Sequence, residues 1–280
     1  MGGRLSHRGR LGLDASGQEH RVGGVRGGHA GGARRAFRCR GDLPGRGRAF
    51  RGRVEVPAAR RAAGLVLRAA SDLRGERVVK VEIILDVPCV WSYFAFNRFQ
   101  RVAARVREAG GELEVGFLPF QLAPEATPEG EFKVDVLRRS FGDGTADAIT
   151  GITAKAAEEG LVFRHERAIY SNTFEAHRLI AVASAQGKGE EMVERLFRAH
   201  HTDELNVGDV DVLRSLAEEV GVTWSDEGAE KLRAELGRVR GLGVRGIPVF
   251  LVDGRELAGA QSEEVLFAAL AGTKGRVRAG

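Results

Sequence analysis

The sequence predicts an α/β fold in which a block of helices interrupts a sheet. An apolar, β-branched run at residues 78–87 is followed by a helical pattern and a second strand-like run. Residues 130–240 then show only helical periodicity. Strand signals return near residue 247 as a hairpin and a final helix, so the predicted order is βαβ, a helical block, then ββα.

The first strand is predicted to be buried on both faces, because nearly every side chain in VVKVEIILDV is apolar rather than every second one. The helix after it has Phe94, Phe99, Val102 and Val106 at helical spacing, and the glycine pair at 110–111 ends it. A second strand is predicted in ELEVGFLPFQL, interrupted by a proline. A strand, a helix and a strand in this order form a parallel βαβ unit.

The central block is predicted to hold helices and no strand. Their ranges are 131–141, 144–160, 172–186, 189–201, 209–221 and 226–237. After the block, IPVFLVDG and RELAGA are predicted strands joined by the turn pair Asp253-Gly254. The last helix is predicted to begin after Ser262, whose hydroxyl suits a helix N-cap and precedes two acidic residues.

Residues 1–77 differ in composition from the rest of the chain. Residues 1–80 hold 19 Lys and Arg against 6 Asp and Glu, whereas the remaining residues hold 24 against 32. The leader is rich in Gly and Arg and poor in apolar side chains, which predicts disorder, and residues 273–280 are predicted to be a tail. Three origins of the leader stay open: a start site assigned too far upstream, an organelle transit peptide, or a basic arm that contacts RNA or another anionic surface.

The basic charge therefore belongs to the leader, and nucleic-acid binding by the folded part is not expected. No apolar run of 18 residues predicts a membrane span. The two cysteines are Cys39, within the leader, and Cys89. This usage does not suggest a disulfide framework, so the cytoplasm is the expected compartment, with an organelle as the alternative if the leader is a transit peptide.

Cys89 follows a buried strand and opens a helix, where unpaired N–H groups and the helix dipole stabilise a thiolate. Such cysteines lose their proton below the usual pKa of about 8.5 and become nucleophilic near neutral pH. Ser92 lies one helical turn further and is placed to donate a hydrogen bond to the thiolate, while Trp91 offers a partner an apolar surface. The alternative is a small buried hydrophobe, the commoner role of a lone cysteine beside a strand.

Five stretches of the chain carry a family resemblance. The first is DVPCVWSY at residues 86–93, and the others are 117–122, 171–179, 194–199, and 243–250 with 259–261. In order and spacing these resemble the DsbA-like thioredoxin family, particularly its FrnE-like branch, whose active site has the pattern Asp-x-x-Cys-Pro-Trp-Cys-Tyr. The resemblance implies a thioredoxin-like fold built from residues 78–129 and 241–272, with an all-helical insertion at 130–240 between them.

The resemblance also implies roles for residues outside the cysteine loop. Pro248 would be a cis-proline that faces Cys89, and Ile247 would offer its backbone to an extended substrate; a plain turn proline is the alternative. Asn172 and His177 would pack and hydrogen-bond along the substrate groove. Gln261 would line the groove or cap the last helix.

Two positions depart from the family pattern: Val90 replaces the proline and Ser92 replaces the second cysteine. A dithiol enzyme oxidises its substrate by giving up an internal disulfide, which Cys89 cannot form with a serine. We therefore expect a monothiol thiol–disulfide oxidoreductase, with no tightly bound cofactor and with glutathione as the candidate co-substrate. One rival is a glutathione-dependent isomerase or transferase of a small aromatic molecule, which predicts a deep apolar pocket. The other is a redox-inactive peptide-binding or chaperone-like module.

A cluster of His200, His201, Asp203 and Glu204 at a helix end is the one candidate metal site. Consecutive histidines on a helix point about 100° apart and do not easily share one ion, so no metal is predicted. The expected partners are a thiol or disulfide protein, or a small molecule. A homodimer is a further possibility.

Overall fold

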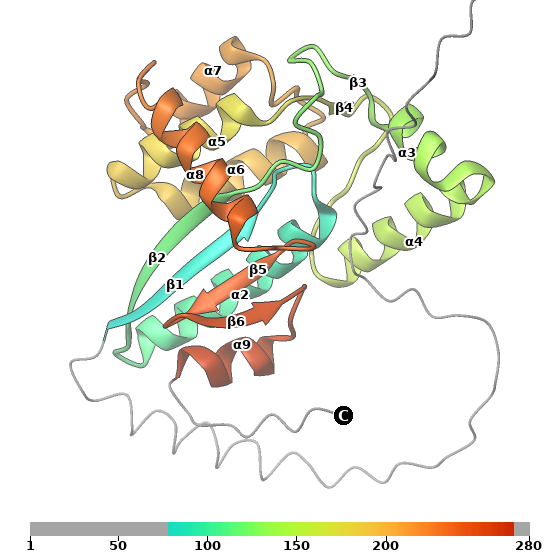
Figure 1. Cartoon of the computed structure of the whole chain (residues 1–280). Helices are drawn as coiled ribbons and strands as arrows, with labels where there is room; N and C mark the ends of the chain where they lie inside the picture. The colour runs from blue at the N-terminus through green and yellow to red at the C-terminus, as the bar shows by residue number, and fades with distance from the viewer. Residues whose placement is uncertain (1–77, 272–280) are drawn as a thin grey trace, which may run out of the picture. The chain divides into compact units, whose positions relative to one another are not determined.

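The computed structural model describes residues 78–271; Cys39 and the predicted leader and tail lie outside the described residues. A four-stranded sheet has the order β2–β1–β5–β6 (Figure 1). β1 (Val78–Leu85) runs parallel to β2 (Glu112–Pro119) and antiparallel to β5 (Val249–Val252), which pairs with β6 (Arg255–Ala258). Because β1 is central, its second half is buried on both faces, at Ile83, Ile84 and Leu85. The prediction of burial on both faces is wrong for the first half, where Val78 and Lys80 are exposed.

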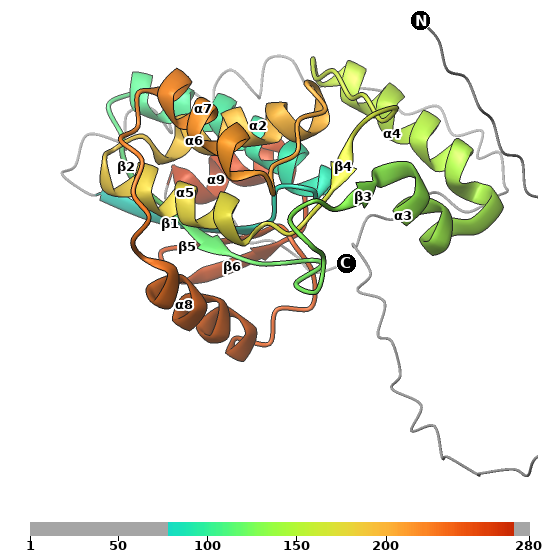
Figure 2. The same cartoon turned by 90° about the horizontal axis from the view of Figure 1, so that it is seen from above.

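Helices cover both faces of this sheet, as the view from above shows (Figure 2). α2 (Val90–Glu108) and α9 (Glu263–Leu270) lie together on one face, and α8 (Ala229–Gly241) lies on the other. Neighbouring side chains of β1 divide between the two layers, because successive residues of a strand point to opposite faces. Ile83 belongs to the core cluster that contains Phe99 of α2, and Ile84 to the cluster that contains Val239 of α8.

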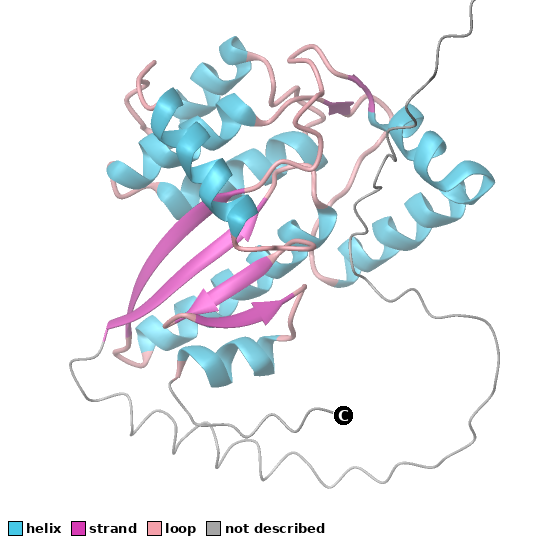
Figure 3. Ribbon diagram, viewed as in Figure 1, coloured by secondary structure: helices cyan, strands magenta, loops and turns pink. Residues whose placement is uncertain are grey.

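The remaining helices lie between β2 and α8 in the chain. They are α3 (Lys133–Phe141), the short 3-10 helix η1 (Gly142–Gly144), α4 (Thr145–Glu158), α5 (Phe174–Ala185), α6 (Gly189–His201) and α7 (Val210–Val220). α5, α6 and α7 pack on one another, and α3 and α4 form a separate hairpin (Figure 3). Within residues 78–271, no helix is long and apolar enough to cross a membrane.

The prediction that residues 130–240 contain no strand is wrong. β3 (Glu131–Phe132) pairs antiparallel with β4 (Ile169–Tyr170). Two residues are too few to show an alternating pattern, so sequence periodicity could not reveal these strands. The small ladder ties the start of α3 to the chain that leads into α5.

Besides α3, whose first two predicted residues form β3, two helices begin at least two residues later than predicted, each for a local reason. α5 begins at Phe174 because the Oδ1 atom of Asn172 accepts a hydrogen bond from the Phe174 N–H at 2.8 Å, which keeps Asn172 outside the helix. α8 begins after Gly228, whose φ of 89° is left-handed and incompatible with a helical turn. Ser262 caps α9 as predicted, accepting from the Val265 N–H at 3.4 Å.

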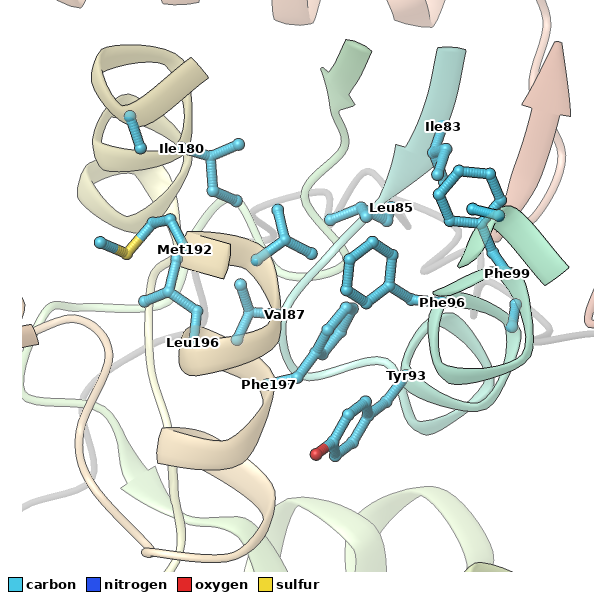
Figure 4. Close-up of a cluster of buried hydrophobic side chains, with 14 of the residues drawn as sticks. Ile83, Leu85, Val87, Tyr93, Phe96, Phe99, Ile180, Met192, Leu196 and Phe197 are labelled. Carbon is cyan, nitrogen blue, oxygen red and sulfur yellow. The ribbon is translucent and has the colours of Figure 1, made fainter. Parts of the chain in front are cut away.

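An aromatic core holds α2 in place between the sheet and α6 (Figure 4). The rings of Tyr93 and Phe197 stack with their centroids 4.9 Å apart, and Phe96 lies 5.9 Å from Phe197. Phe99 contacts Phe250 of β5 with a centroid distance of 5.9 Å. Each such ring contributes about 1.5–3 kcal/mol by its burial, so the first turn of α2 is rigidly positioned.

Candidate functional site

Cys89 is the N-cap residue of α2, with an extended backbone conformation (φ −80°, ψ 107°). Its N–H donates to the carbonyl of Asp86 at 3.1 Å, and its own carbonyl accepts from the Tyr93 N–H at 3.2 Å. The residue is 2% exposed. The sulfur thus belongs to the residue that precedes the unpaired N–H groups of the first helical turn, where a negative charge is stabilised.

The structure brings Cys89 and Ile247 together. The Cys89 thiol donates to the Ile247 carbonyl, with the sulfur and oxygen 3.9 Å apart, and the Ile247–Pro248 peptide bond is cis. An apolar cluster surrounds this contact, and Trp91 packs against it; its buried members besides Cys89 and Ile247 are Ile84, Leu118, Phe120, Val239 and Val249. The site is therefore an apolar environment at the carboxyl end of β1, with a backbone carbonyl directed at the sulfur.

Ser92 does not make the hydrogen bond expected of it. The residue is 1% exposed, and its Oγ atom has no hydrogen-bond partner within residues 78–271. The Cys89 thiol donates to the Ile247 carbonyl, and no hydrogen bond joins the Ser92 hydroxyl to the sulfur. A buried hydroxyl without a partner lowers the free energy of unfolding by about 1–3 kcal/mol, so Ser92 destabilises the fold at this position.

The buried carboxylate of Asp86 organises the chain just before Cys89. Its Oδ1 atom accepts from the Val87 N–H at 2.9 Å, and its Oδ2 atom accepts from the Leu122 N–H at 2.7 Å. His177 Nε2 lies 3.1 Å from Asp86 Oδ1 and 2.8 Å from the Phe120 carbonyl. Since both neighbours of Nε2 accept, this nitrogen carries a hydrogen. Asp86 thereby joins the end of β1 to the chain after β2 and to α5.

Sequence reasoning assigned no role to Asp86, although a single carboxylate at the end of an apolar strand was the available signal.

The side chains of Asn172 and Gln261 form hydrogen bonds that hold nearby backbone in place. Asn172 Oδ1 accepts from Gln121 Nε2 at 3.0 Å, and its Nδ2 donates to the Pro124 carbonyl at 2.9 Å. The Gln261 amide donates to the Ala258 carbonyl at 2.5 Å, and Ser262 rather than Gln261 caps α9.

A group of buried basic side chains lies beside the Cys89 loop. Its members are Lys133, His165, His200 and His201, none more than 7% exposed. Lys133 Nζ lies 3.3 Å from His201 Nδ1, and His201 Nε2 lies 3.0 Å from the Val87 carbonyl. Because a carbonyl only accepts, His201 donates from Nε2 and accepts from Lys133 at Nδ1. Lys133 is thus connected through one imidazole to the residue two positions before Cys89.

The predicted cluster around His200 is divided in the structure. Asp203 pairs with Arg195 at 2.9 Å, and Glu204 pairs with Arg167 at 3.2 Å. Both ring nitrogens of His200 are buried without a hydrogen-bond partner in the described range. No group of three metal-ligating side chains occurs among residues 78–271.

Burial lowers the pKa of every member of the basic group. It lowers the pKa of Lys133 to about 8, and the charge of Cys89 partly opposes this shift. Burial lowers the pKa of His165 to about 4, aided by the charge of Lys133. It holds the pKa values of His200 and His201 well below the ordinary value of 6.5, again with Lys133 contributing.

These shifts predict a loss of stability in mild acid. Above about pH 6.5 the histidines are neutral in both states, but below it they gain protons only when the chain unfolds. Each fully buried histidine then lowers the free energy of unfolding by up to about 1.4 kcal/mol per pH unit. Urea unfolding at several pH values checks this, and the His200→Gln variant should show a shallower fall. A free energy of unfolding that stays constant from about pH 7 to pH 5 would contradict the assignment.

Two surface cavities lie elsewhere, beside α2 and α6. They have volumes of about 450 and 390 Å³, and Gln100 lines both. Cys89 lines neither of them. These cavities therefore do not supply the deep apolar pocket that a small-molecule isomerase would need at the sulfur.

Comparison with known proteins gives consistent results. The DSBA-like thioredoxin domain family matches residues 80–271. The crystal structure of a probable DsbA oxidoreductase from Streptomyces coelicolor superposes with a TM-score of 0.62 at 28% identity, covering 72% of this chain and 94% of that chain. An uncharacterized Bacillus subtilis protein, YwbO, is 22% identical over 200 residues, which are 67% of this chain and 93% of that protein.

Proposed function

Since this chain belongs to the DSBA-like thioredoxin domain family, we propose that it is a thiol–disulfide oxidoreductase acting as a monothiol through Cys89. The observation that carries the proposal is the placement of Cys89 at the N-cap of α2, with a serine one turn on where a second thiol would stand. The motif DVPCVWSY further supports a place in the FrnE-like branch.

The first step is attack by the Cys89 thiolate on one sulfur of a substrate disulfide. A bond forms between that sulfur and Cys89, the substrate disulfide breaks, and its other sulfur leaves as a thiolate. The thiol no longer donates to the Ile247 carbonyl in this adduct, so the carbonyl becomes available to accept an N–H from the bound substrate. The 2% exposure of Cys89 means that a neighbouring group, for which we propose Trp91, moves aside to admit the substrate.

The second step requires a thiol from outside the site, because Ser92 cannot supply one. We propose glutathione for this role. Its thiolate attacks the mixed disulfide on Cys89, and Cys89 leaves as a thiolate. If Cys89 carries the substrate, the product is a disulfide between glutathione and the substrate. If Cys89 carries glutathione, the product is glutathione disulfide. A glutathionylated protein and one glutathione would thus yield a protein thiol and glutathione disulfide. Such a reaction suits the reducing conditions of the cytoplasm, which we propose as the compartment.

Incubation of the full chain with glutathione disulfide tests the proposal. We expect one glutathione at Cys89, located by mass spectrometry of peptides, and its release by excess reduced glutathione. The Cys39→Ser variant is the matched control and should form the same adduct, whereas Cys89→Ser should not. An adduct found only at Cys39 would overturn the proposal. It would favour the redox-inactive binding module, in which Cys89 is an apolar member of the cluster around Ile84 and Phe120.

A further inference from the structure

Lys133 is a buried cation whose partner needs to be identified. It begins α3, is 3% exposed, and its backbone N–H is fixed to the Ala168 carbonyl at 2.8 Å. Its ammonium contacts His201 Nδ1, a neutral acceptor. No carboxylate in the described part of the chain forms an ion pair with it. Buried charges are normally paired, because their transfer from water is costly without a compensating charge.

The charged groups around Lys133 leave one candidate. The imidazoles of His165, His200 and His201 interact electrostatically with it and are neutral near pH 7, because burial and the lysine charge lower their pKa values. The carboxylates near it in the chain are bonded elsewhere: Asp135 to Arg138, Glu131 to Arg139, and Glu204 to Arg167, while Glu166 accepts from the backbone N–H of His165. The buried carboxylate of Asp86 on the cysteine loop is likewise occupied, because it accepts from the N–H groups of Val87 and Leu122. Cys89 is the group that interacts electrostatically with Lys133 and becomes an anion when it loses its proton.

We propose that Lys133 is the counter-charge of the Cys89 thiolate, and that the contacts from Lys133 to His201 and from His201 to Val87 hold it beside the cysteine loop. This inference rests on the proposed function and adds a positioning residue to it. The helix N-terminus contributes partial charges, and Lys133 adds a full charge that water does not screen. The ammonium thereby takes the stabilising role that the Ser92 hydroxyl does not fill.

The pairing has a consequence for both steps of the exchange. When Cys89 attacks a disulfide, its negative charge departs with the leaving sulfur, and Lys133 is left buried without an anion. When the resolving thiolate attacks the mixed disulfide, Cys89 leaves as a thiolate and the pair forms again. A leaving sulfur that is stabilised as an anion leaves faster, so Lys133 favours release of the mixed disulfide.

The pH dependence of Cys89 alkylation tests the inference. The measurement uses the full chain carrying Cys39→Ser, so that only Cys89 reacts. Lys133→Met removes the charge and the hydrogen-bond donor, and Lys133→Gln removes the charge while keeping a donor for His201. Both should raise the midpoint of alkylation by at least about one pH unit, and slow alkylation near neutral pH about tenfold. Lys133→Arg should keep the wild-type midpoint.

Lys231→Met is the matched control, since Lys231 is exposed on α8 and its loss changes the net charge equally. Circular dichroism establishes which variants fold, and Lys133→Gln preserves the test if Lys133→Met does not. A reactive wild-type cysteine whose midpoint is unchanged in the folded variant overturns the role of Lys133 alone. A wild-type cysteine that titrates as a free thiol, near pH 8.5, and forms no glutathione adduct overturns the proposed function as well.

Discussion

Replacing Cys89 with serine is expected to lower the rate of glutathione-dependent disulfide exchange at least about 10³-fold, the scale of loss when the nucleophile of a covalent mechanism is removed. A serine hydroxyl stays protonated near neutral pH and cannot form a disulfide. The rate is measured as release of glutathione from a glutathionylated peptide. Because a hydroxyl replaces a thiol in an apolar cluster, thermal unfolding should accompany the assay to show that the variant is folded.

Two further variants test the roles of Cys39 and of position 92 in the same assay. Cys39→Ser should retain the wild-type rate, which excludes the other cysteine. Ser92→Cys should change the product: a second thiol one turn along α2 allows an internal disulfide with Cys89, so less mixed disulfide accumulates and less external thiol is needed. Retention of the wild-type rate by Cys89→Ser would contradict the mechanism, whatever the outcome of the other two.

Replacing Asp86 with alanine is expected to lower the free energy of unfolding by about 3–5 kcal/mol. The carboxylate is fully buried and accepts from the backbone of Val87 and Leu122 and from His177. Alanine would leave the buried donors of Val87 and His177 and the partly buried N–H of Leu122 without that acceptor, and each buried group costs about 1–3 kcal/mol. Urea unfolding monitored by far-ultraviolet circular dichroism measures the difference.

Asp86→Asn and Asp209→Ala are the matched variants for this measurement. Asparagine retains an oxygen for Val87 and His177, but its amide nitrogen cannot accept from Leu122, so a smaller loss is expected. Asp209 is an exposed carboxylate that caps α7 by accepting from the Asp211 N–H at 2.8 Å, and its removal should cost about 1 kcal/mol. A loss for Asp86→Ala no larger than that for Asp209→Ala would show that the buried network is unimportant.

The order of the elements was predictable because its signals are local. The burial of the second half of β1 on both faces follows from the consecutive apolar residues Ile83, Ile84 and Leu85. The hairpin follows from Asp253-Gly254, both of which have positive φ as such a turn requires. β3 and β4 gave no comparable signal, since a two-residue pairing depends on where the rest of the chain brings those residues together.

The site was predictable in part for the same reason. Cys89 and Ile247 belong to recognisable segments, and the structure brings them within 3.9 Å between thiol and carbonyl. Lys133 could not be predicted, because a lysine in the first turn of a short helix usually faces water. Its burial results from the packing of α3 beside His201 and the Cys89 loop, which only the tertiary structure specifies.

The hairpin of α3 and α4 that carries Lys133 is secured by few buried side chains; those in its two helices are Lys133, Thr145 and Ala156. Segments with little buried apolar surface open at a lower free energy than the core around them. Opening of this hairpin would take the ammonium away from the thiolate while the sheet and α2 stay folded. The sulfur would then lose nucleophilicity without any global unfolding, so fluctuations of a peripheral helical pair would set the fraction of molecules that are chemically competent.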